Sequence, residues 1–105
     1  MIENVSDKNF NEKVLNFKGL TVVDFWADWC GPCKMLSVVL EDIDKEFKSK
    51  INIKKINIDL NPKLKEKYKI MSIPTILIFL NGKLIDTIIG FLNKEELKER
   101  INNLI

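Results

Sequence analysis

Two spacings of apolar residues alternate along the chain, one typical of buried β-strands and the other of amphipathic helices. Residues 20–27 are almost continuously apolar or aromatic, which predicts a strand covered on both faces of a sheet. Asn81-Gly82 separates two further apolar runs as a two-residue hairpin turn, so the second run should return antiparallel. The predicted strands span residues 2–5, 20–27, 51–58, 75–80 and 84–89, with a break in alternation at Lys54-Lys55.

Apolar residues at helical spacing predict four helices between and after these strands. The first should begin at Ser6 or Asp7, either of which can cap it, and end at Gly19. Its inner face should carry Phe10, Val14 and Phe17. The longest helix follows residue 33 and has one broad apolar face. That face comprises Met35, Leu36, Val39, Leu40, Ile43 and Phe47.

The two remaining helices have clear start signals. Asn61-Pro62 predicts a short helix that is capped by the asparagine and has proline in its first turn. Asn93 predicts the start of the last helix, with Glu96 as its capping-box partner. The inward residues of that last helix should be Leu97, Ile101 and Leu104.

The predicted order β-α-β-α-β-α-β-β-α indicates an α/β fold. Strands joined through helices pair in parallel and the final hairpin adds antiparallel strands, so we expect a mixed central sheet of about five strands with helices on both faces. The chain has 105 residues, 46% of them hydrophobic. We therefore expect one domain, residues 1–105, that buries its own core.

Lys and Arg number 17 against 15 Asp and Glu, a net charge of +2. Nucleic-acid-binding domains usually carry a concentrated basic patch, so this balance gives no support for a nucleic-acid partner. The first residues lack a basic segment followed by an apolar stretch, and no apolar run reaches membrane-spanning length. We therefore expect a cytoplasmic location and no membrane partner. Cysteines in that compartment are kept largely reduced.

Both cysteines of the chain lie in the stretch Trp29-Cys30-Gly31-Pro32-Cys33-Lys34, directly after an apolar run. A thiol pair at this spacing can close into a small disulfide ring and reopen, which indicates redox chemistry. A structural zinc site usually takes four Cys or His ligands, and the chain has no histidine. A metal or iron–sulfur cluster shared by two chains, or an inert pair, are the alternatives. A stapling role is weak because so small a ring removes little entropy from the unfolded chain.

Disulfide exchange requires a thiolate as the nucleophile. Cys30 stands at the start of the long helix, where free backbone N–H groups and the helix dipole favour an anion. Pro32 suits the first helical turn, where its missing N–H costs little. We expect Cys33, one turn further in, to be more buried, so Cys30 attacks the substrate and Cys33 resolves the mixed disulfide.

Several other residues allow both a functional and an ordinary structural interpretation. Asp24 stands alone in an apolar strand, so burial should raise its pKa, but its hydrogen bonds could serve stability alone. Lys55 taken alone is a solvated charge. Pro74 taken alone is a trans proline at the start of an edge strand. Trp26 suits the core, whereas Trp29 beside Cys30 suits an apolar wall for substrates. Gly31, Gly82 and Gly90 suggest backbone requirements.

The chain resembles the thioredoxin family over essentially its full length. The resemblance rests on a highly specific cysteine motif and on weaker matches in the same order and spacing. The matching stretches are Val23-Asp24-Phe25-Trp26-Ala27, Trp29-Cys30-Gly31-Pro32-Cys33-Lys34, Asn57-Ile58-Asp59, Asn61-Pro62, Ile73-Pro74-Thr75, Phe79 with Asn81-Gly82, and Gly90.

The resemblance implies a thioredoxin fold and a role for each matching residue. Asp24 would act as general acid/base for Cys33, and Lys55 would pair with Asp24. The Ile73-Pro74 bond would be cis and would present backbone groups to an extended substrate segment. Gly90 would let that segment approach closely. The neighbouring residues Met71, Ser72, Phe91 and Leu92 would border the same surface.

The resemblance also implies a protein-disulfide reductase that binds no cofactor itself. Thioredoxin reductase would re-reduce it with electrons from NADPH. Implied clients include ribonucleotide reductase, peroxiredoxins and methionine sulfoxide reductases, and a monomer is expected. One alternative is a disulfide oxidase or isomerase, whose motif usually carries histidine between the cysteines. Another is an interaction subunit whose thiols are dispensable.

The chain departs from the family pattern at two places. Val38 stands where many members have a helix-kinking proline, so a straighter helix is expected. Met71-Ser72 stands where members often have a charged residue and glycine. Partner preference is therefore not carried over from the family.

Overall fold

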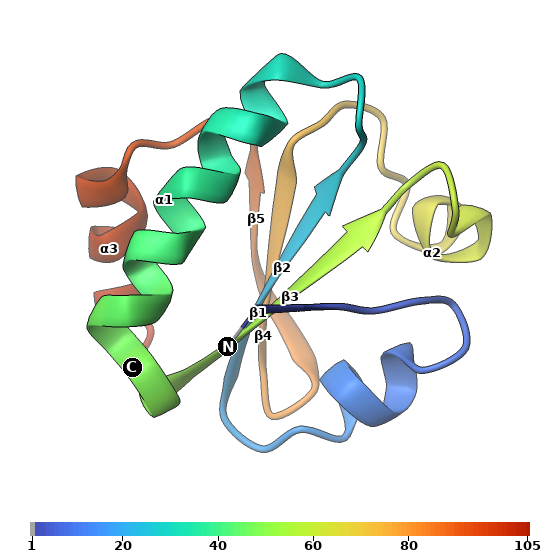
Figure 1. The fold of residues 1–105 in the computed structure, drawn as a ribbon. Helices are drawn as coiled ribbons and strands as arrows, with labels where there is room; N and C mark the ends of the chain where they lie inside the picture. The colour runs from blue at the N-terminus through green and yellow to red at the C-terminus, as the bar shows by residue number, and fades with distance from the viewer. Residues whose placement is uncertain (1) are drawn as a thin grey trace.

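Five strands form one mixed sheet in the computed structural model, which describes residues 2–105 (Figure 1). The strands are β1 (Ile2–Asn4), β2 (Leu20–Trp26), β3 (Ile51–Asn57), β4 (Thr75–Leu80) and β5 (Lys83–Ile89). Their spatial order is β1-β3-β2-β4-β5. β3 is parallel to both β1 and β2, whereas β4 is antiparallel to both β2 and β5. The predicted α/β class and mixed sheet are confirmed.

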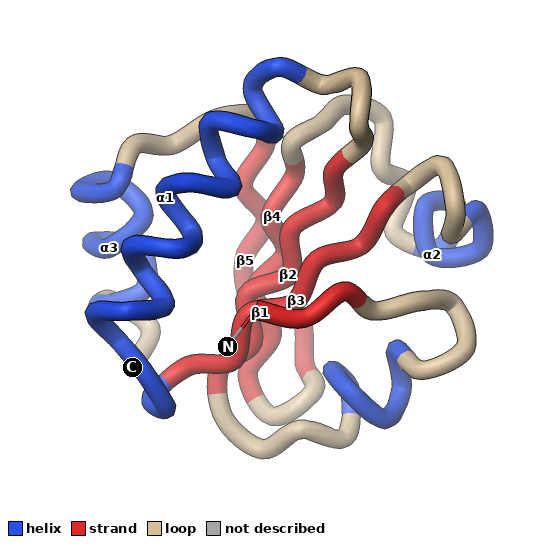
Figure 2. The backbone as a smooth tube through the Cα atoms, in the orientation of Figure 1, coloured by secondary structure: helices blue, strands red, loops and turns tan. Residues whose placement is uncertain are grey.

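The helices cover both faces of this sheet (Figure 2). Two of them, α1 (Gly31–Phe47) and α3 (Lys94–Asn102), lie together on one side. On the other side lie α2 (Pro62–Lys67) and a short π-helical segment, η1 (Asn11–Leu15). A single 3-10 turn, η2 (Lys48–Lys50), links α1 to β3. Because β2 has cover on both faces, almost all of its residues are buried.

Each face of the sheet has its own hydrophobic core. Beneath α1 and α3 the core is aliphatic and includes Leu36, Leu40, Ile43, Leu97 and Ile101. The face beneath η1 and α2 holds an aromatic cluster of Phe10, Phe25, Tyr68 and Phe79, with ring centroids 5.6 to 6.4 Å apart. Both cysteines belong to this second core, which ties the redox site to the aromatic side.

The predicted first helix is wrong in extent and in its cap. Residues 7–9 form a turn, and the helical segment is limited to η1. Phe10 and Val14 are buried as expected, but Phe17 is 37% exposed. The Asp7 carboxylate instead accepts the backbone N–H groups of Lys63 and Leu64, and so caps α2. This long-range partner satisfies N–H groups that are free at any helix start.

Two further local predictions need correction. Asn61 precedes α2 but makes no side-chain cap. Its amide instead accepts the Asp7 backbone N–H and donates to the Asn57 carbonyl. Met35 is 58% exposed because it lies outside the buried stripe of α1. That buried stripe is Leu36, Leu40, Ile43 and Phe47.

The short-range signals near the C-terminus are confirmed. Asn81 and Gly82 join β4 to β5, both with positive φ. Gly82 has φ +80°, and a Cβ there would strike the carbonyl oxygen of Leu15, so only glycine fits. Asn93 and Glu96 form a complete capping box at the start of α3.

Candidate active site

The two cysteines meet where β2 ends and α1 begins. Cys30 is the N-cap residue of α1, its Sγ accepts the backbone N–H of Cys33 at 3.2 Å, and the two residues form a disulfide. The first turn of α1 contains Pro32, which lacks the N–H that a helix start leaves unpaired. The burial of the two cysteines is nearly equal, 5% and 3% exposed, so burial does not separate them as expected. Their positions do distinguish them, because Cys30 is the N-cap residue and Cys33 lies inside α1.

Open space surrounds Gly31, where a Cβ would meet no atom within 4 Å. Gly31 also lacks a positive φ, so the expected backbone requirement does not hold there. The disulfide ring is therefore unobstructed on this side. Gly90 does have a positive φ of +94°, and its N–H donates to the Pro74 carbonyl at 2.8 Å.

Trp29 forms an exposed wall beside the cysteines. Its side chain is 68% exposed, and its Nε1–H donates to the Asp59 carboxylate at 2.9 Å. Together with Ile73 and Lys65 it lines a cavity of about 320 Å³. Asp59 was not predicted as a site residue, although it stands in the matching stretch Asn57-Ile58-Asp59.

The segment before β4 completes this surface. Ile73 is half-buried and lies across the cavity from Trp29, and the Ile73–Pro74 peptide bond is cis, the isomer implied by the resemblance. Met71 is 93% exposed, and Ser72 anchors the turn through its carbonyl, which accepts the Thr75 hydroxyl at 2.6 Å. Apolar side chains thus stand exposed next to the redox site.

Asp24 is fully buried in the middle of β2. Its neighbours across the sheet are Lys55 on β3 and Ile76 on β4. Among residues 2–105, neither carboxylate oxygen of Asp24 has a hydrogen-bond partner. Burial raises the pKa of Asp24 to about 7, while the positive charge of Lys55 opposes this shift. A buried carboxyl of this kind can exchange a proton near neutral pH.

The ammonium group of Lys55 does not reach Asp24. It donates to the Ser37 hydroxyl on α1 at 2.8 Å and lies 5.0 Å from the centre of the Trp26 ring. A cavity of about 160 Å³ is lined by these three residues and by Cys33, so the lysine and Cys33 border one cavity. Ser37 was missed by the sequence analysis, because a single serine on an amphipathic helix carries no signal.

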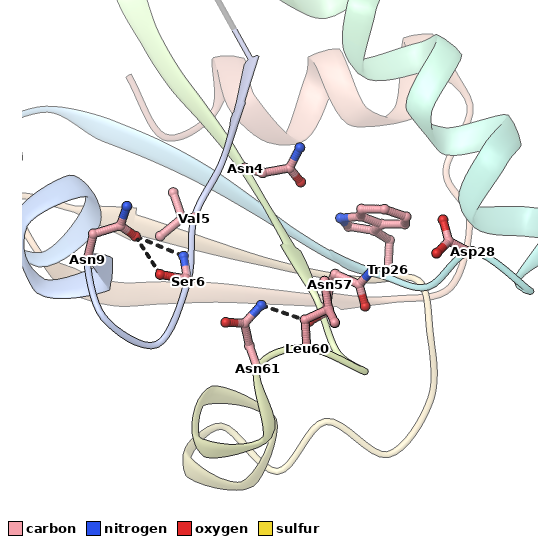
Figure 3. A pocket seen from close by; sticks show the side chains of 9 residues that line it. All are labelled: Asn4, Val5, Ser6, Asn9, Trp26, Asp28, Asn57, Leu60 and Asn61. Carbon is pink, nitrogen blue, oxygen red and sulfur yellow. Dashed lines mark hydrogen bonds between the residues drawn. The ribbon is translucent and has the colours of Figure 1, made fainter.

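A larger cavity of about 600 Å³ is also lined by Trp26 (Figure 3). Asn57 and Asn61 line it, and the Asn61 amide donates to the Asn57 carbonyl at 2.9 Å. The buried Trp26 Nε1 has no hydrogen-bond partner within the described part of the chain. Trp26 and Asp28 thus line both this asparagine-rich cavity and the smaller one beside Cys33.

Within residues 2–105, no group of three or more Cys, His, Asp or Glu side chains could hold a metal ion. A separate finding concerns membranes: over the same residues, no helix combines the length and apolar character needed to cross one.

A dithiol–disulfide pair at the end of a central strand, held by a helix N-terminus, defines a thiol–disulfide oxidoreductase. The thioredoxin family model matches residues 1–103. Thioredoxin of Rickettsia bellii is 49% identical over 105 residues, which is 100% of both chains, and that of Rickettsia felis is 48% identical over the same span. Thioredoxin of Buchnera aphidicola is 46% identical over 101 residues, 96% of this chain and 94% of that protein.

The chain belongs to the thioredoxin family. Members of this family generally pass electrons from thioredoxin reductase to disulfides of other proteins. The reversible dithiol/disulfide exchange at Cys30-Gly31-Pro32-Cys33 is the activity that the family and the disulfide together establish.

Proposed function

We propose that this protein is a general protein-disulfide reductase in which Cys30 is the nucleophile and Cys33 the resolving thiol. Residues 1–105 act as one thioredoxin domain. The observation that carries these roles is the place of Cys30 at the N-cap of α1, with the Cys33 N–H aimed at its sulfur. That N–H and the helix dipole stabilise a thiolate at Cys30 when the disulfide is open.

In the first step the client becomes covalently joined to the protein. The Cys30 thiolate attacks one sulfur of the client disulfide, the client S–S bond breaks, and its other sulfur leaves as a thiolate. The product is a mixed disulfide between Cys30 and the client. Gly31 leaves open space for this approach, and Pro32 fixes the turn that holds the two thiols together.

The second step releases the client. Asp24 accepts the proton of the Cys33 thiol, and the resulting thiolate attacks Cys30 Sγ. The mixed disulfide breaks, the Cys30–Cys33 disulfide forms, and the client leaves with its second thiolate. The client gains two electrons and the protein dithiol loses two. A carboxyl group with a pKa of about 7 suits this transfer because it can accept and return protons near neutral pH. Lys55 tunes Asp24 by its charge.

The client chain binds along Trp29, Ile73, Pro74 and Gly90. The exposed indole of Trp29 and the half-buried Ile73 share one cavity, which supports this path. The client adds to the surface as an extended strand, so backbone hydrogen bonds supply affinity without demanding one sequence.

The protein works as a monomer in the cytoplasm and carries no bound cofactor. Thioredoxin reductase returns its electrons, which come from NADPH. Its clients include ribonucleotide reductase, peroxiredoxins and methionine sulfoxide reductases. Neither nucleic acid nor a membrane takes part. The net charge of +2 and the family of the chain support this proposal.

Trapping tests the roles of the two cysteines. A Cys33→Ser variant should accumulate mixed disulfides through Cys30 when it is incubated with an oxidised client protein, as seen on non-reducing gels. The matched Cys30→Ser variant should trap none. Trapping by Cys30→Ser alone would reverse the assignment.

Two further measurements separate the alternatives. The reduction potential of the Cys30/Cys33 pair should be about −270 mV, the value typical of thioredoxins. A potential of about −120 to −180 mV would instead indicate an oxidase or isomerase. A Cys30→Ser/Cys33→Ser double variant should fail to support the cellular role. Full support by that variant would favour an interaction subunit instead.

A further inference from the structure

The two sides of the client-binding surface differ in charge. One side is the basic segment, residues 63–69, which holds Lys63, Lys65, Lys67 and Lys69 with Glu66 as the lone acid. All four lysines are exposed, and none has an ion pair among the described residues. The other side is apolar, with Ile89 at 72% and Phe91 at 38% exposure.

Two of these lysines border the client path directly. Lys65 lines the cavity that holds Trp29 and Ile73. Lys69 lines the adjacent cavity of about 140 Å³, together with Met71 and Ile89. The Asp59 carboxylate also lies in the first cavity, but it accepts the Trp29 indole N–H. Positive charge therefore dominates this side of the path.

We propose that the basic segment is a docking surface for acidic residues that flank the client disulfide. This proposal rests on the reductase function and names the class of client that the reductase prefers. Exposed lysines steer an acidic partner during diffusion and raise the association rate, with little demand on its exact sequence. The apolar side receives uncharged residues, so the preferred client has acidic residues on one flank of its cysteine only.

Matched peptides test the proposal. Each contains one intramolecular disulfide, with Asp and Glu on one flank in the first peptide and Asn and Gln at the same positions in the second. At low salt the reduced protein should reduce the acidic peptide about tenfold faster, within the range for electrostatic steering. A Lys65→Glu/Lys69→Glu variant should lose this preference, and so should the wild type at 1 M salt, where charges are screened. A Lys45→Glu/Lys48→Glu control, changed at the far end of α1, should keep it.

Equal rates for the two peptides, or an equal loss in the control variant, would overturn the docking surface. Reduction of a small neutral disulfide, bis(2-hydroxyethyl) disulfide, provides the internal reference. Its rate should be the same in the wild type and in the Lys45→Glu/Lys48→Glu control. If the wild type fails to reduce it, the reductase function fails, and that result is distinct from loss of charge preference.

A different observation, the hydrogen bond from Lys55 to Ser37, carries a second inference. The buried Asp24 carboxyl has no partner, while the Lys55 ammonium beside it binds a hydroxyl on α1. We infer that Ser37 is a positioning residue, which holds the Lys55 ammonium toward α1 and away from Asp24. This role deepens the proposed function of Asp24 as proton acceptor and rests on it.

The groups around Asp24 make the effect specific. β3 contributes Lys55, and β4 contributes the apolar Ile76. Cys33, Lys34 and Asp28 line the cavity that the Lys55 ammonium borders. If Ser37 is replaced by alanine, the unpartnered Asp24 oxygens become the acceptor to which the ammonium turns. The closer positive charge then favours the carboxylate.

Titration of Asp24 in the oxidised protein tests this role, because Cys30 and Cys33 are then joined and do not titrate. The midpoint, followed by the carboxyl ¹³C chemical shift, should fall by about one pH unit in Ser37→Ala. Ser37→Thr keeps the hydroxyl and should match the wild type. An unchanged or raised midpoint in Ser37→Ala, or an equal shift in Ser37→Thr, would overturn the inference. Failure of Asp24 as proton acceptor would show instead as an unchanged resolution rate in Asp24→Asn.

Discussion

A network of polar residues near the ends of β2 and β3 and a single carboxyl inside β2 differ in how their hydrogen bonds are satisfied. The first, which we call the Asn61 network, runs from Asp7 through Asn61 and Asn57 to Asp59 and Trp29. Each of its members has at least one partner. The second is Asp24, whose two oxygens have none among residues 2–105.

The Asn61 network has a structural role, whereas the unsatisfied Asp24 carboxyl has a raised pKa. Polar groups with satisfied hydrogen bonds fix the local geometry. The Asn61 network connects the N-terminal segment to α2 and to the Trp29 indole beside the redox site. An unsatisfied buried carboxyl destabilises the fold, but it gains a pKa of about 7. The chain therefore tolerates a loss of stability at the position where a mobile proton is useful.

The largest expected effect concerns Asp24 and pH. Its pKa is about 7 in the folded protein against 3.8 for the free side chain. Between these values the folded state holds a proton that the unfolded chain has released, so the free energy of unfolding decreases as the pH rises. Asp24→Asn removes this dependence. We compare the free energies of unfolding of the oxidised variant and the oxidised wild type. Variant minus wild type, this difference should be about 4 kcal/mol larger at pH 8 than at pH 3.

Denaturant unfolding at pH 3, 5 and 8 measures this effect. The exposed Asp42 provides a matched control, and Asp42→Asn should follow the wild-type curve at every pH. If wild type and Asp24→Asn differ by the same amount at all three values, the buried carboxyl does not carry the pH dependence.

The next effect breaks the Asn61 network at its centre. Asn61→Ala leaves the Asp7 backbone N–H without its partner and removes one of two donors to the Asn57 carbonyl, which still accepts the Leu60 N–H. An unsatisfied group costs about 1–3 kcal/mol, so we expect a loss of about 2 kcal/mol in urea unfolding. The exposed Asn102 is the control, and Asn102→Ala should change stability by less than about 0.5 kcal/mol. A loss of that small size in Asn61→Ala would mean that the network contributes no stability.

A smaller effect is expected where the network caps α2. Asp7→Ala removes the acceptor of the Lys63 and Leu64 N–H groups and should cost about 1 kcal/mol. Asp7→Asn retains an acceptor oxygen and should cost less. Amide hydrogen exchange at Lys63 and Leu64 should accelerate in the alanine variant; unchanged protection there would contradict the cap.

The smallest effect lies at the exposed end of the network. Asp59→Ala removes the acceptor of the Trp29 indole N–H and should lower stability by less than about 1 kcal/mol. The indole proton of Trp29 should nevertheless shift in the NMR spectrum and exchange faster with solvent. Asp59→Asn keeps an acceptor and should retain the slower exchange. Identical indole signals in the wild type and Asp59→Ala would show that Trp29 does not donate a hydrogen bond to Asp59.

Signals carried by neighbouring residues predicted the fold well. The Asn81-Gly82 turn and the Asn93/Glu96 capping box depend on contacts within a few residues, and both occur as expected. The cap of α2 did not follow from sequence, because Asp7 lies far away in the chain and meets Lys63 and Leu64 only after folding. Local pattern rules therefore assigned Asp7 to the wrong helix.

In the candidate active site too, local sequence signals predicted some features, while contacts between distant segments were missed. The spacing of Cys30 and Cys33 indicated redox chemistry directly, and the isolated Asp24 in an apolar strand indicated a buried carboxyl with a raised pKa. The partner of Lys55 did not follow from sequence, because the family resemblance implied Asp24 while the Lys55 side chain bonds to Ser37 on α1. Asp59 was likewise missed as a site residue, since its contact with Trp29 joins two separate loops.

The strand order β1-β3-β2-β4-β5 has a consequence for synthesis of the chain. Both neighbours of β2 come after it in sequence, so this almost fully buried strand emerges from the ribosome with two open edges. It can pair only after residues 51–57 have been made, and its second edge closes only with β4. A nascent chain halted near residue 50 thus exposes the central strand of the sheet. This is the stage at which the chain is most prone to aggregate and most in need of a chaperone.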